Sequence, residues 1–514
     1  MDKQLKKAII ITGIAALVIR IIYGLSFLIS ELAVFNDLEG LDMATLLEFS
    51  QWDRNTDRSA PMFVLHRFLL FFCYLAAGKS HNVLLIYIVQ SLFGAAASMF
   101  AVIGVWNFSK SFRASLLAGL MYALYGPFLL YESVALQEAV LTHTLTIGFV
   151  IYLVFLKKNS ALYGILSGII LGLNSAGRPA SAFLAVAMAF YGLWIKRKEK
   201  ISAADTSFSV SLGAVWLAAA LFNGYFRNSF NPFFNVMPHL ADVHNAAPAA
   251  AGTLQQPSAF SAYFNVLLGA VKNVPALFGM REIPENLDYD TLRQILPLLS
   301  FGPLIVIPFA SAGIISQALL KRKELIVCYM ALFFLAFPLA ARIPIGRYRL
   351  LLMPFFIFFA ALFIEEIIKN KPKRLALAAI FIGVVGTNLC FASPLVRPNP
   401  AAHHTLGLAA MKTRANFLPH LHRAWELSQY TYKPSGLMLI VHHIQKYEFS
   451  RAEKIIMQNK TDAPEFIYYH ALVKTAQNQP KEAEKLLQSI PDPQRLGTLY
   501  PKFQKLNSFL QSKR

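Results

Sequence analysis

The chain has 514 residues, of which 56% are hydrophobic and 15% are charged, and its formal net charge is +20. Soluble proteins average about 25% charged residues, so this composition excludes an ordinary soluble protein. The three cysteines lie in apolar segments, and their spacing indicates neither a disulfide framework nor a zinc site. The basic residues stand in short clusters between apolar runs, a pattern that does not indicate nucleic-acid binding.

Apolar runs of about twenty residues recur through the first 393 positions, and each can cross a hydrocarbon core of about 30 Å. The first run, Ala8 to Ile29, is too long for the core of a signal peptide and has no clear cleavage site after it, so we expect a retained helix. The eleven predicted spans are about 8–30, 82–106, 114–130, 139–156, 160–176, 180–195, 207–225, 295–320, 325–341, 350–368 and 375–393.

Six clusters of lysine and arginine flank these runs. They are Lys3–Lys7, Lys110–Arg113, Lys157–Lys158, Lys196–Lys200, Lys321–Lys323 and Lys369–Arg374. Lysine and arginine are enriched in the cytoplasmic loops of membrane proteins. With all six clusters in the cytoplasm, the eleven spans cross the membrane in alternating directions without contradiction. We therefore expect a multi-pass inner (cell) membrane protein with a cytoplasmic N-terminus and a periplasmic, extracytoplasmic C-terminus.

One further apolar segment, Pro61 to Gly78, contains His66 and Arg67. Counting it as a span would reverse every later loop and move the basic clusters outside. We expect it to lie along the outer interface as an amphipathic or re-entrant helix. The alternative is that it spans and that the first helix does not.

The predicted outer loops hold most of the charged residues that suggest chemistry. They are the acidic residues Asp42, Glu132 and Glu138 and the arginines Arg178, Arg347 and Arg349. Carboxylates beside a membrane are functional candidates by default, and a carboxylate can take the proton of an acceptor hydroxyl. Arginine suits phosphate because its planar fork donates two hydrogen bonds to phosphate oxygens. These residues on one membrane face therefore predict a carboxylate that acts as general base next to arginines that bind phosphate.

Several motifs at these positions resemble one family, the GT-C class of integral-membrane glycosyltransferases. The chain is similar to its protein O-mannosyltransferase and lipid A aminoarabinose transferase superfamily, in the glycosyltransferase family 39-like branch, over about residues 1–395. The motifs that carry the resemblance are Leu41–Thr45, Ala60–Phe63, Ala77–His81, Ile88–Leu92, Tyr131–Glu132, Leu136–Glu138, Gly177–Pro179, Arg281–Asn286, Arg347–Leu350 and Met353–Pro354.

The resemblance implies an all-α, GT-C-like bundle that transfers a sugar from a polyprenyl-phosphate donor at the outer face. It implies that Asp42 is the catalytic base. It also implies that Glu138 is the catalytic acidic residue of the second outer loop, residues 131–138, with Glu132 as the alternative residue for that role. Arg347 and Arg349, with Arg178, would hold the donor phosphate. The implied acceptor is a lipid, glycan or protein, and membrane lipids surround the bundle. No cofactor or metal site is assigned, although some relatives use a divalent metal.

Plainer interpretations stay open. Asp42 could cap the following helix, Glu132 could be a solvated loop charge, and Glu138 could simply meet a helix N-terminal dipole. Arg347 and Arg349 could bind lipid headgroups. Because Thr45 and Leu46 stand where the family commonly has a tyrosine, the alternative function is a catalytically inactive membrane scaffold or partner-binding protein in envelope glycan assembly. A transporter should show internal repeats, and none is clear in this sequence.

The segment 396–514 has a different character. Apolar runs stop, Arg397–Pro400 resembles a linker, and amphipathic helical patterns follow. Ala452 and Ala483 are separated by 31 positions, close to the period of tetratricopeptide repeats, which is about 34 residues. We expect a soluble helical, tetratricopeptide-like domain at 396–514 that binds the membrane domain 1–395 or a protein partner, with an unrelated helical domain as the alternative.

Overall fold

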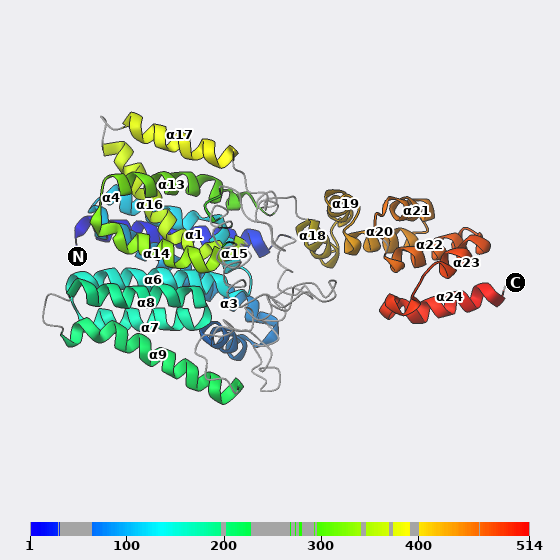
Figure 1. Ribbon diagram of the computed structural model, residues 1–514, viewed down its shortest axis with the longest axis horizontal. Coiled ribbons are helices and arrows are strands. Elements are labelled where there is room, and N and C mark those ends of the chain that lie inside the picture. Colours follow the sequence, from blue (N-terminus) through cyan, green and yellow to red (C-terminus); the bar gives the residue numbers. More distant parts are fainter. Residues whose placement is uncertain are drawn as a thin grey trace. The chain divides into compact units, whose positions relative to one another are not determined.

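The computed structural model describes residues 2–28, 30, 64–196, 202–227, 296–340, 346–369, 374–390, 400–461 and 463–512, together with positions 268, 273, 277–279 and 292. Asp42, His66 and Arg67 are outside the residues whose side chains are described. Throughout the described residues the regular elements are helices, which confirms the all-α prediction (Figure 1). The contacts divide the chain into two units, residues 1–283 with 292–396 and residues 284–291 with 397–514.

The helices of the first unit are α1 (Lys3–Leu28), α3 (Val64–Ser109), α4 (Phe112–Leu124), α5 (Gly126–Glu132), α6 (Gln137–Lys158), α7 (Ala161–Gly177), α8 (Pro179–Lys196), α9 (Ala203–Arg227), η4 (Pro297–Ser300), α13 (Pro303–Leu319), η5 (Lys323–Leu325), α14 (Ile326–Ala340), α15 (Gly346–Arg349), η6 (Leu350–Leu352), α16 (Met353–Lys369) and α17 (Arg374–Cys390). Within the described residues, six helices are long and apolar enough to cross a membrane, and a bent pair makes a seventh candidate. Four shorter apolar helices fall where the other predicted spans lie. The first unit is therefore a multi-pass membrane bundle.

Two predicted elements differ from the structure. The span expected at 114–130 is bent by 46° between α4 and α5. Tyr125 has extended backbone angles at the break, and Pro127 lies at the start of α5, where its missing N–H is tolerated. The segment Pro61–Gly78, expected as a separate helix, continues from Val64 onward into the next span as the 46-residue helix α3. Its expected position along the interface stays a prediction.

Helix α16 is buried along most of its length. Phe355, Phe356, Phe358 and Phe359 are all buried, so these rings pack against protein rather than lipid. A helix that is apolar on every side belongs in such a core. Its neighbours include α13 and α4, and the mutual packing of α6, α7, α8 and α9 forms a second group (Figure 1).

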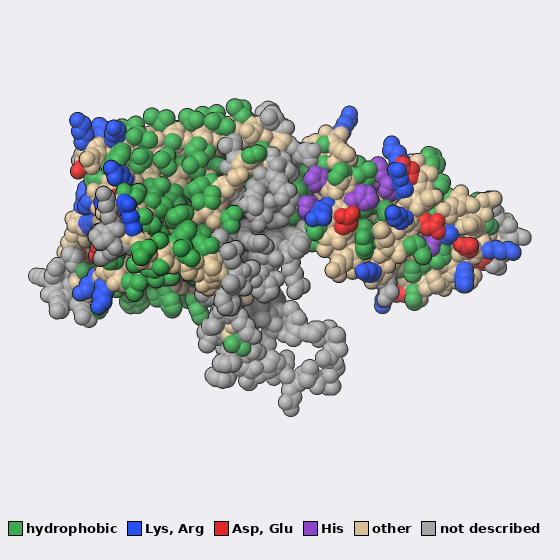
Figure 2. Space-filling model, turned by 90° about the horizontal axis from the view of Figure 1, so that it is seen from above, with side chains coloured by type: hydrophobic (Ala, Val, Ile, Leu, Met, Phe, Trp, Pro, Cys, Tyr) green, Lys and Arg blue, Asp and Glu red, His purple; other side chains and the backbone are tan. Residues whose placement is uncertain are grey.

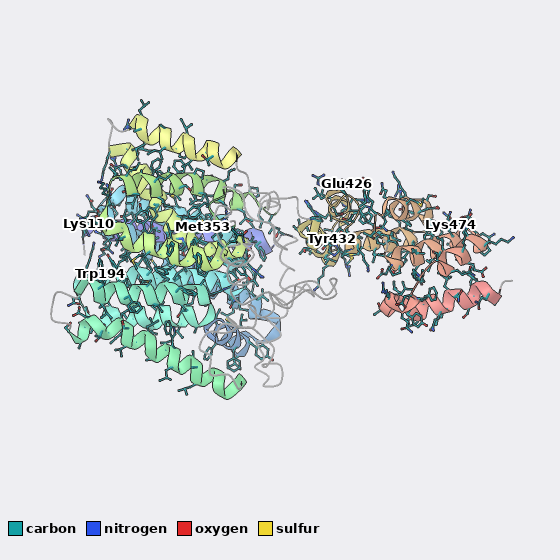
Figure 3. All side chains as sticks on the ribbon, viewed as in Figure 1. Lys110, Trp194, Met353, Glu426, Tyr432 and Lys474 are labelled. Atoms are coloured by element: carbon teal, nitrogen blue, oxygen red, sulfur yellow. The ribbon has the colours of Figure 1, made fainter. Side chains whose placement is uncertain are left out.

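Charge is sorted along the bundle. Hydrophobic side chains cover its flank, and lysines and arginines gather at the end that carries the N-terminus (Figure 2). Lys110 and Trp194 lie at this end as well (Figure 3). We call it the basic end. Helix α6 runs from Glu138 in its first turn to Lys157 and Lys158 in its last, so about 30 Å of helix separates the two ends.

The second unit contains α18 (Pro400–Lys412), α19 (Leu418–Leu427), α20 (Lys433–Gln445), α21 (Phe449–Gln458), α22 (Pro464–Ala476), α23 (Pro480–Gln488), η8 (Pro493–Leu499) and α24 (Tyr500–Ser512). From α18 to α23, each helix packs against the next one along the chain. Trp425 stacks on Phe466 in the core with their centroids 5.8 Å apart, and Ala452 and Ala483 are fully buried. The tetratricopeptide assignment stays a prediction.

Histidines are frequent in this unit. His403 stacks on His420, and burial together with the nearby His420 and Arg423 lowers the pKa of His403 to about 4. His403 is therefore neutral at physiological pH. Among the described residues, no group of three or more His, Cys, Asp or Glu side chains is arranged to hold a metal ion.

Small residues bring α7 and α9 close together. Gly164, Gly168 and Gly172 form a four-residue repeat on α7 that meets Ser207, Ser211 and Val215 on α9. A Cβ on Gly168 would lie 2.6 Å from the backbone oxygen of Phe208. Such small-residue repeats allow membrane helices to pack backbone to backbone.

We predict that Gly168→Val separates α7 from α9 and destabilises the protein by about 1–3 kcal/mol, as expected for overpacking. The matched control is Gly213→Val on α9, because a Cβ at Gly213 meets nothing within 4 Å. The unfolding free energy of the detergent-solubilised chain measures both effects. Equal losses in the two variants would contradict the close packing at Gly168.

Candidate functional site

The described candidate residues fall into two groups in the membrane unit. Glu132 lies at the end of α5, which is buried along its whole length by the bend at Tyr125. Glu138 lies in the first turn of α6, and Arg178 follows the last residue of α7. Arg347 and Arg349 lie on the short helix α15. Asp42 is outside the described residues.

Glu132 is fully buried in a network of charged and polar side chains. Nη2 of Arg20 lies 2.6 Å from its Oε1, and Nε2 of His143 lies 2.9 Å from the same oxygen. On the other side of the ring, Nδ1 of His143 is 3.0 Å from the hydroxyl of Tyr122. Buried carboxylates require such partners because desolvation of an isolated charge is expensive.

The sequence singles out neither Arg20 nor His143 as a partner of Glu132. An arginine within the first apolar run was itself a signal, since charged residues inside spans almost always have a partner. The solvated-loop interpretation of Glu132 is wrong, because its side chain is 0% exposed.

The connection between α5 and α6 is held by further hydrogen bonds. Nε2 of Gln90 donates to the carbonyl of Val134 at 3.1 Å, and the hydroxyls of Tyr23 and Ser133 lie 3.4 Å apart. These contacts join α1, α3 and the link 133–136. The link leads into the first turn of α6, which contains Glu138, so these contacts connect the buried network with the start of α6.

Glu138 forms a short ion pair with Arg178. The guanidinium of Arg178 also lies over the ring of Tyr348, 4.6 Å from its centroid, and that of Arg347 lies 5.5 Å from the same centroid. We call these four residues, Glu138, Arg178, Arg347 and Tyr348, the Arg178 cluster. It joins three segments separated in the sequence by up to 210 positions, counted as 348 minus 138.

Asn174 explains why Arg178 lies beside α6. Its side-chain amide donates to the carbonyl of Leu141 at 2.6 Å and to the hydroxyl of Thr144 at 2.8 Å. Asn174 is fully buried one turn before Arg178, whose N–H donates to the Asn174 carbonyl at 3.1 Å. The end of α7 is thereby tied to the first turns of α6.

Arg349 has a different partner. It is 1% exposed, and its Nη1 donates to the carbonyl of Gly279 at 2.6 Å. Arg347, two residues earlier, is only half-buried. Tyr348, to which the sequence interpretation gave no role of its own, is the ring over which both Arg178 and Arg347 lie.

The Arg178 cluster contains two arginines and one carboxylate. Glu138 is 5% exposed, and its Oε2 has no hydrogen-bond partner among the described residues. Both guanidinium groups lie over the Tyr348 ring, where cation–π attraction helps to hold them in place. Glu138 lies at the start of α6, and α6 ends at Lys158 at the basic end. Arg347 precedes α16, which ends at Lys369, also at the basic end. The Arg178 cluster therefore lies at the opposite end of the bundle.

Fold and site together define a multi-pass α-helical membrane protein with charged clusters at opposite ends of its bundle. No family model matches the chain, and a search of curated proteins finds no match. Among solved structures it is similar to the archaeal oligosaccharyltransferase AglB from Archaeoglobus fulgidus, in complex with an inhibitory peptide and a dolichol-phosphate, with 14% identity and a TM-score of 0.43. The similarity covers 80% of this chain and 56% of that one, so the chain spans little more than half of that protein.

We predict that Arg20→Met destabilises the protein by about 3–5 kcal/mol, because it leaves Glu132 buried without its main counter-charge. The double variant Arg20→Met/Glu132→Met should be much closer to wild type, since no unpaired charge remains. Unfolding free energies in detergent measure this, with Lys323→Met at an exposed position as the control. The single variant Glu132→Met completes the comparison. If the double variant loses as much unfolding free energy as the two single variants lose together, the ion pair is ruled out as the cause.

Proposed function

We propose that the chain is a membrane glycosyltransferase that moves a sugar from a polyprenyl-phosphate donor to an acceptor hydroxyl at the end of the bundle opposite the basic end. The observation that carries the proposal is the Arg178 cluster, in which two arginines from distant segments share one tyrosine ring beside a single carboxylate. Arginine pairs of this kind suit a phosphate that must be held and then released as a leaving group.

In the proposed reaction the acceptor oxygen attacks C1 of the sugar while the bond from C1 to the phosphate oxygen breaks. The electron pair of that bond leaves with polyprenyl phosphate, whose growing negative charge Arg178 and Arg347 stabilise. Asp42 takes the proton of the acceptor hydroxyl as general base. One displacement of this kind inverts the configuration at C1 and requires no covalent intermediate with the chain.

The two second-loop acids receive different roles in this proposal. Glu138 orients Arg178 through their ion pair. Glu132 is enclosed with Arg20 and His143, so it acts by holding the link that leads into Glu138. Arg349 fastens α15 through the Gly279 carbonyl and thereby presents Arg347 and Tyr348.

The topology follows from the same proposal. The basic end faces the cytoplasm by the positive-inside rule, which places the Arg178 cluster on the outer, periplasmic side of the inner membrane. The second unit would then also be extracytoplasmic, where it could bind an acceptor or a protein partner.

We predict that Asp42→Asn lowers transfer by a factor of about 10²–10⁴ while donor affinity stays near wild type, because only proton abstraction is lost. Arg178→Lys should instead weaken donor binding, since lysine can neither bind phosphate through two parallel hydrogen bonds nor stack on Tyr348 as a planar group. The measurements are product formation and donor affinity in membranes supplied with a panel of polyprenyl-phosphate sugars.

The control for this experiment is Arg374→Gln, a change at the first residue of α17. This variant should transfer sugar as wild type does. Mass spectrometry of the glycolipids and glycoproteins lost on deletion of the chain identifies the product to follow. Full transfer by Asp42→Asn would exclude the general base. If no sugar of the panel is transferred and deletion removes no glycoconjugate, the chain is an inactive scaffold instead.

A further inference from the structure

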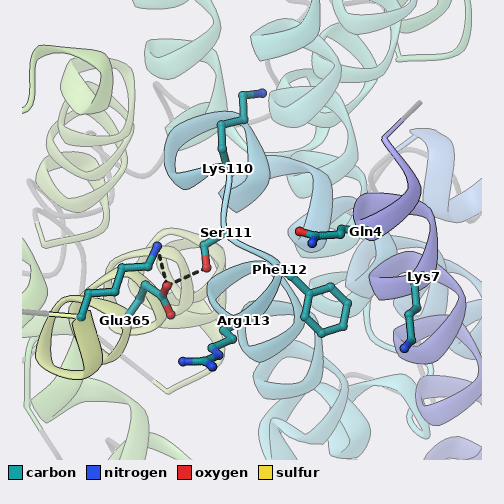
Figure 4. A pocket seen from close by; sticks show the side chains of 8 residues that line it. Gln4, Lys7, Lys110, Ser111, Phe112, Arg113 and Glu365 are labelled. Carbon is teal, nitrogen blue, oxygen red and sulfur yellow. Dashed lines mark hydrogen bonds and ion pairs between the residues drawn. The ribbon is translucent and has the colours of Figure 1, made fainter.

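A second charged site lies in a pocket at the basic end of the bundle. It has a volume of about 440 Å³ and is formed by the start of α1, the junction of α3 with α4, and the last turns of α16 (Figure 4). These three segments are far apart in the sequence. The pocket is separate from the Arg178 cluster, because α16 begins near that cluster and ends at this pocket.

The lining is strongly positive. Four cations, Lys7, Lys110, Arg113 and Lys369, line the pocket together with one carboxylate, that of Glu365. That carboxylate is already engaged, since Nζ of Lys369 lies 2.7 Å from its Oε1 and the hydroxyl of Ser111 donates to the same oxygen at 2.6 Å (Figure 4). Three cations remain, and none of them forms an ion pair with a carboxylate within the described part of the chain.

The backbone at the junction of α3 and α4 contributes to this arrangement. Lys110 adopts a left-handed conformation with φ of 51°, which is uncommon for a residue with a side chain. It ends α3 and allows α4 to begin at Phe112, with Ser111 as its N-cap. This tight junction places Lys110 and Arg113 around the same pocket.

An apolar surface leads away from the pocket along α1. Ile10, Ile11 and Ile14 follow Lys7 at the spacings that bring residues onto one helix face, and their side chains are 49%, 36% and 60% exposed. In a membrane this face meets acyl chains. A free phosphate would use only the cations, whereas a phospholipid would use the cations and this adjoining apolar face.

We propose that the pocket binds the phosphate of an anionic phospholipid, with an acyl chain lying along the exposed isoleucines of α1. Basic pockets between helices at the membrane surface suit such headgroups, and each nearby lysine or arginine strengthens binding about fivefold. The lipid is a ligand distinct from the glycosyl donor, because its site is at the other end of the bundle. This inference does not depend on the proposed transfer reaction.

The test uses the full chain in a neutral detergent, titrated with phosphatidylglycerol or phosphatidylcholine and analysed by native mass spectrometry. Wild type should retain phosphatidylglycerol in preference to phosphatidylcholine. Lys110→Gln/Arg113→Gln should weaken retention of phosphatidylglycerol about 25-fold, at about fivefold for each charge removed. Lys7→Gln, a change at an exposed position, should weaken it about fivefold and covers the case in which the double variant does not fold.

The matched control is Lys158→Gln/Lys323→Gln, which removes the same charge from exposed positions at the same end but outside the pocket. It should bind phosphatidylglycerol as wild type does. Equal losses in this control and in the pocket variants would overturn the proposal in favour of general surface attraction. Displacement of the lipid by inorganic phosphate at millimolar concentration would also overturn it, because the ligand would then be a soluble phosphate.

Discussion

Much of the membrane unit depends on the burial of Glu132. A carboxylate without water must be matched by positive charge or by hydrogen-bond donors, and here Arg20 on α1 and His143 on α6 supply them. The contacts of Glu132 join α1, α5 and α6. After the bend between α4 and α5, all residues of α5 are buried, Glu132 among them. The link that follows Glu132 then leads into the first turn of α6, where Glu138 meets Arg178.

The bundle separates its charges over about one bilayer thickness. At one end, arginines share a tyrosine ring beside a carboxylate, and at the other, lysines and an arginine surround a pocket whose carboxylate is already engaged. Helix α16 connects the two regions and is buried through most of its length. Both regions are suited to phosphate, but we assign them different partners: a glycosyl donor at the Arg178 cluster and a structural lipid at the basic pocket.

Much of this organisation could be predicted from the sequence. Apolar runs and basic clusters indicate helices and their directions, and these directions alone place Glu138, Arg178 and Arg347 at one end. The pairing of Arg20 with Glu132 could not be predicted, because the two residues are 112 positions apart and only tertiary packing brings them together. The same holds for Tyr348, whose role depends on two guanidinium groups from different helices. The continuity of α3 was missed because the polar residues Lys79, Ser80 and His81 interrupt the apolar pattern between the two predicted segments without interrupting the helix.

The proposed transfer requires that the Arg178 cluster bind the donor phosphate. A structure of the full chain with a bound polyprenyl phosphate would show where that phosphate lies. We expect phosphate oxygens about 2.7–2.9 Å from guanidinium nitrogens of Arg178 and Arg347. Phosphate bound only in the basic pocket around Lys110 and Arg113, with the Arg178 cluster unoccupied, would contradict it.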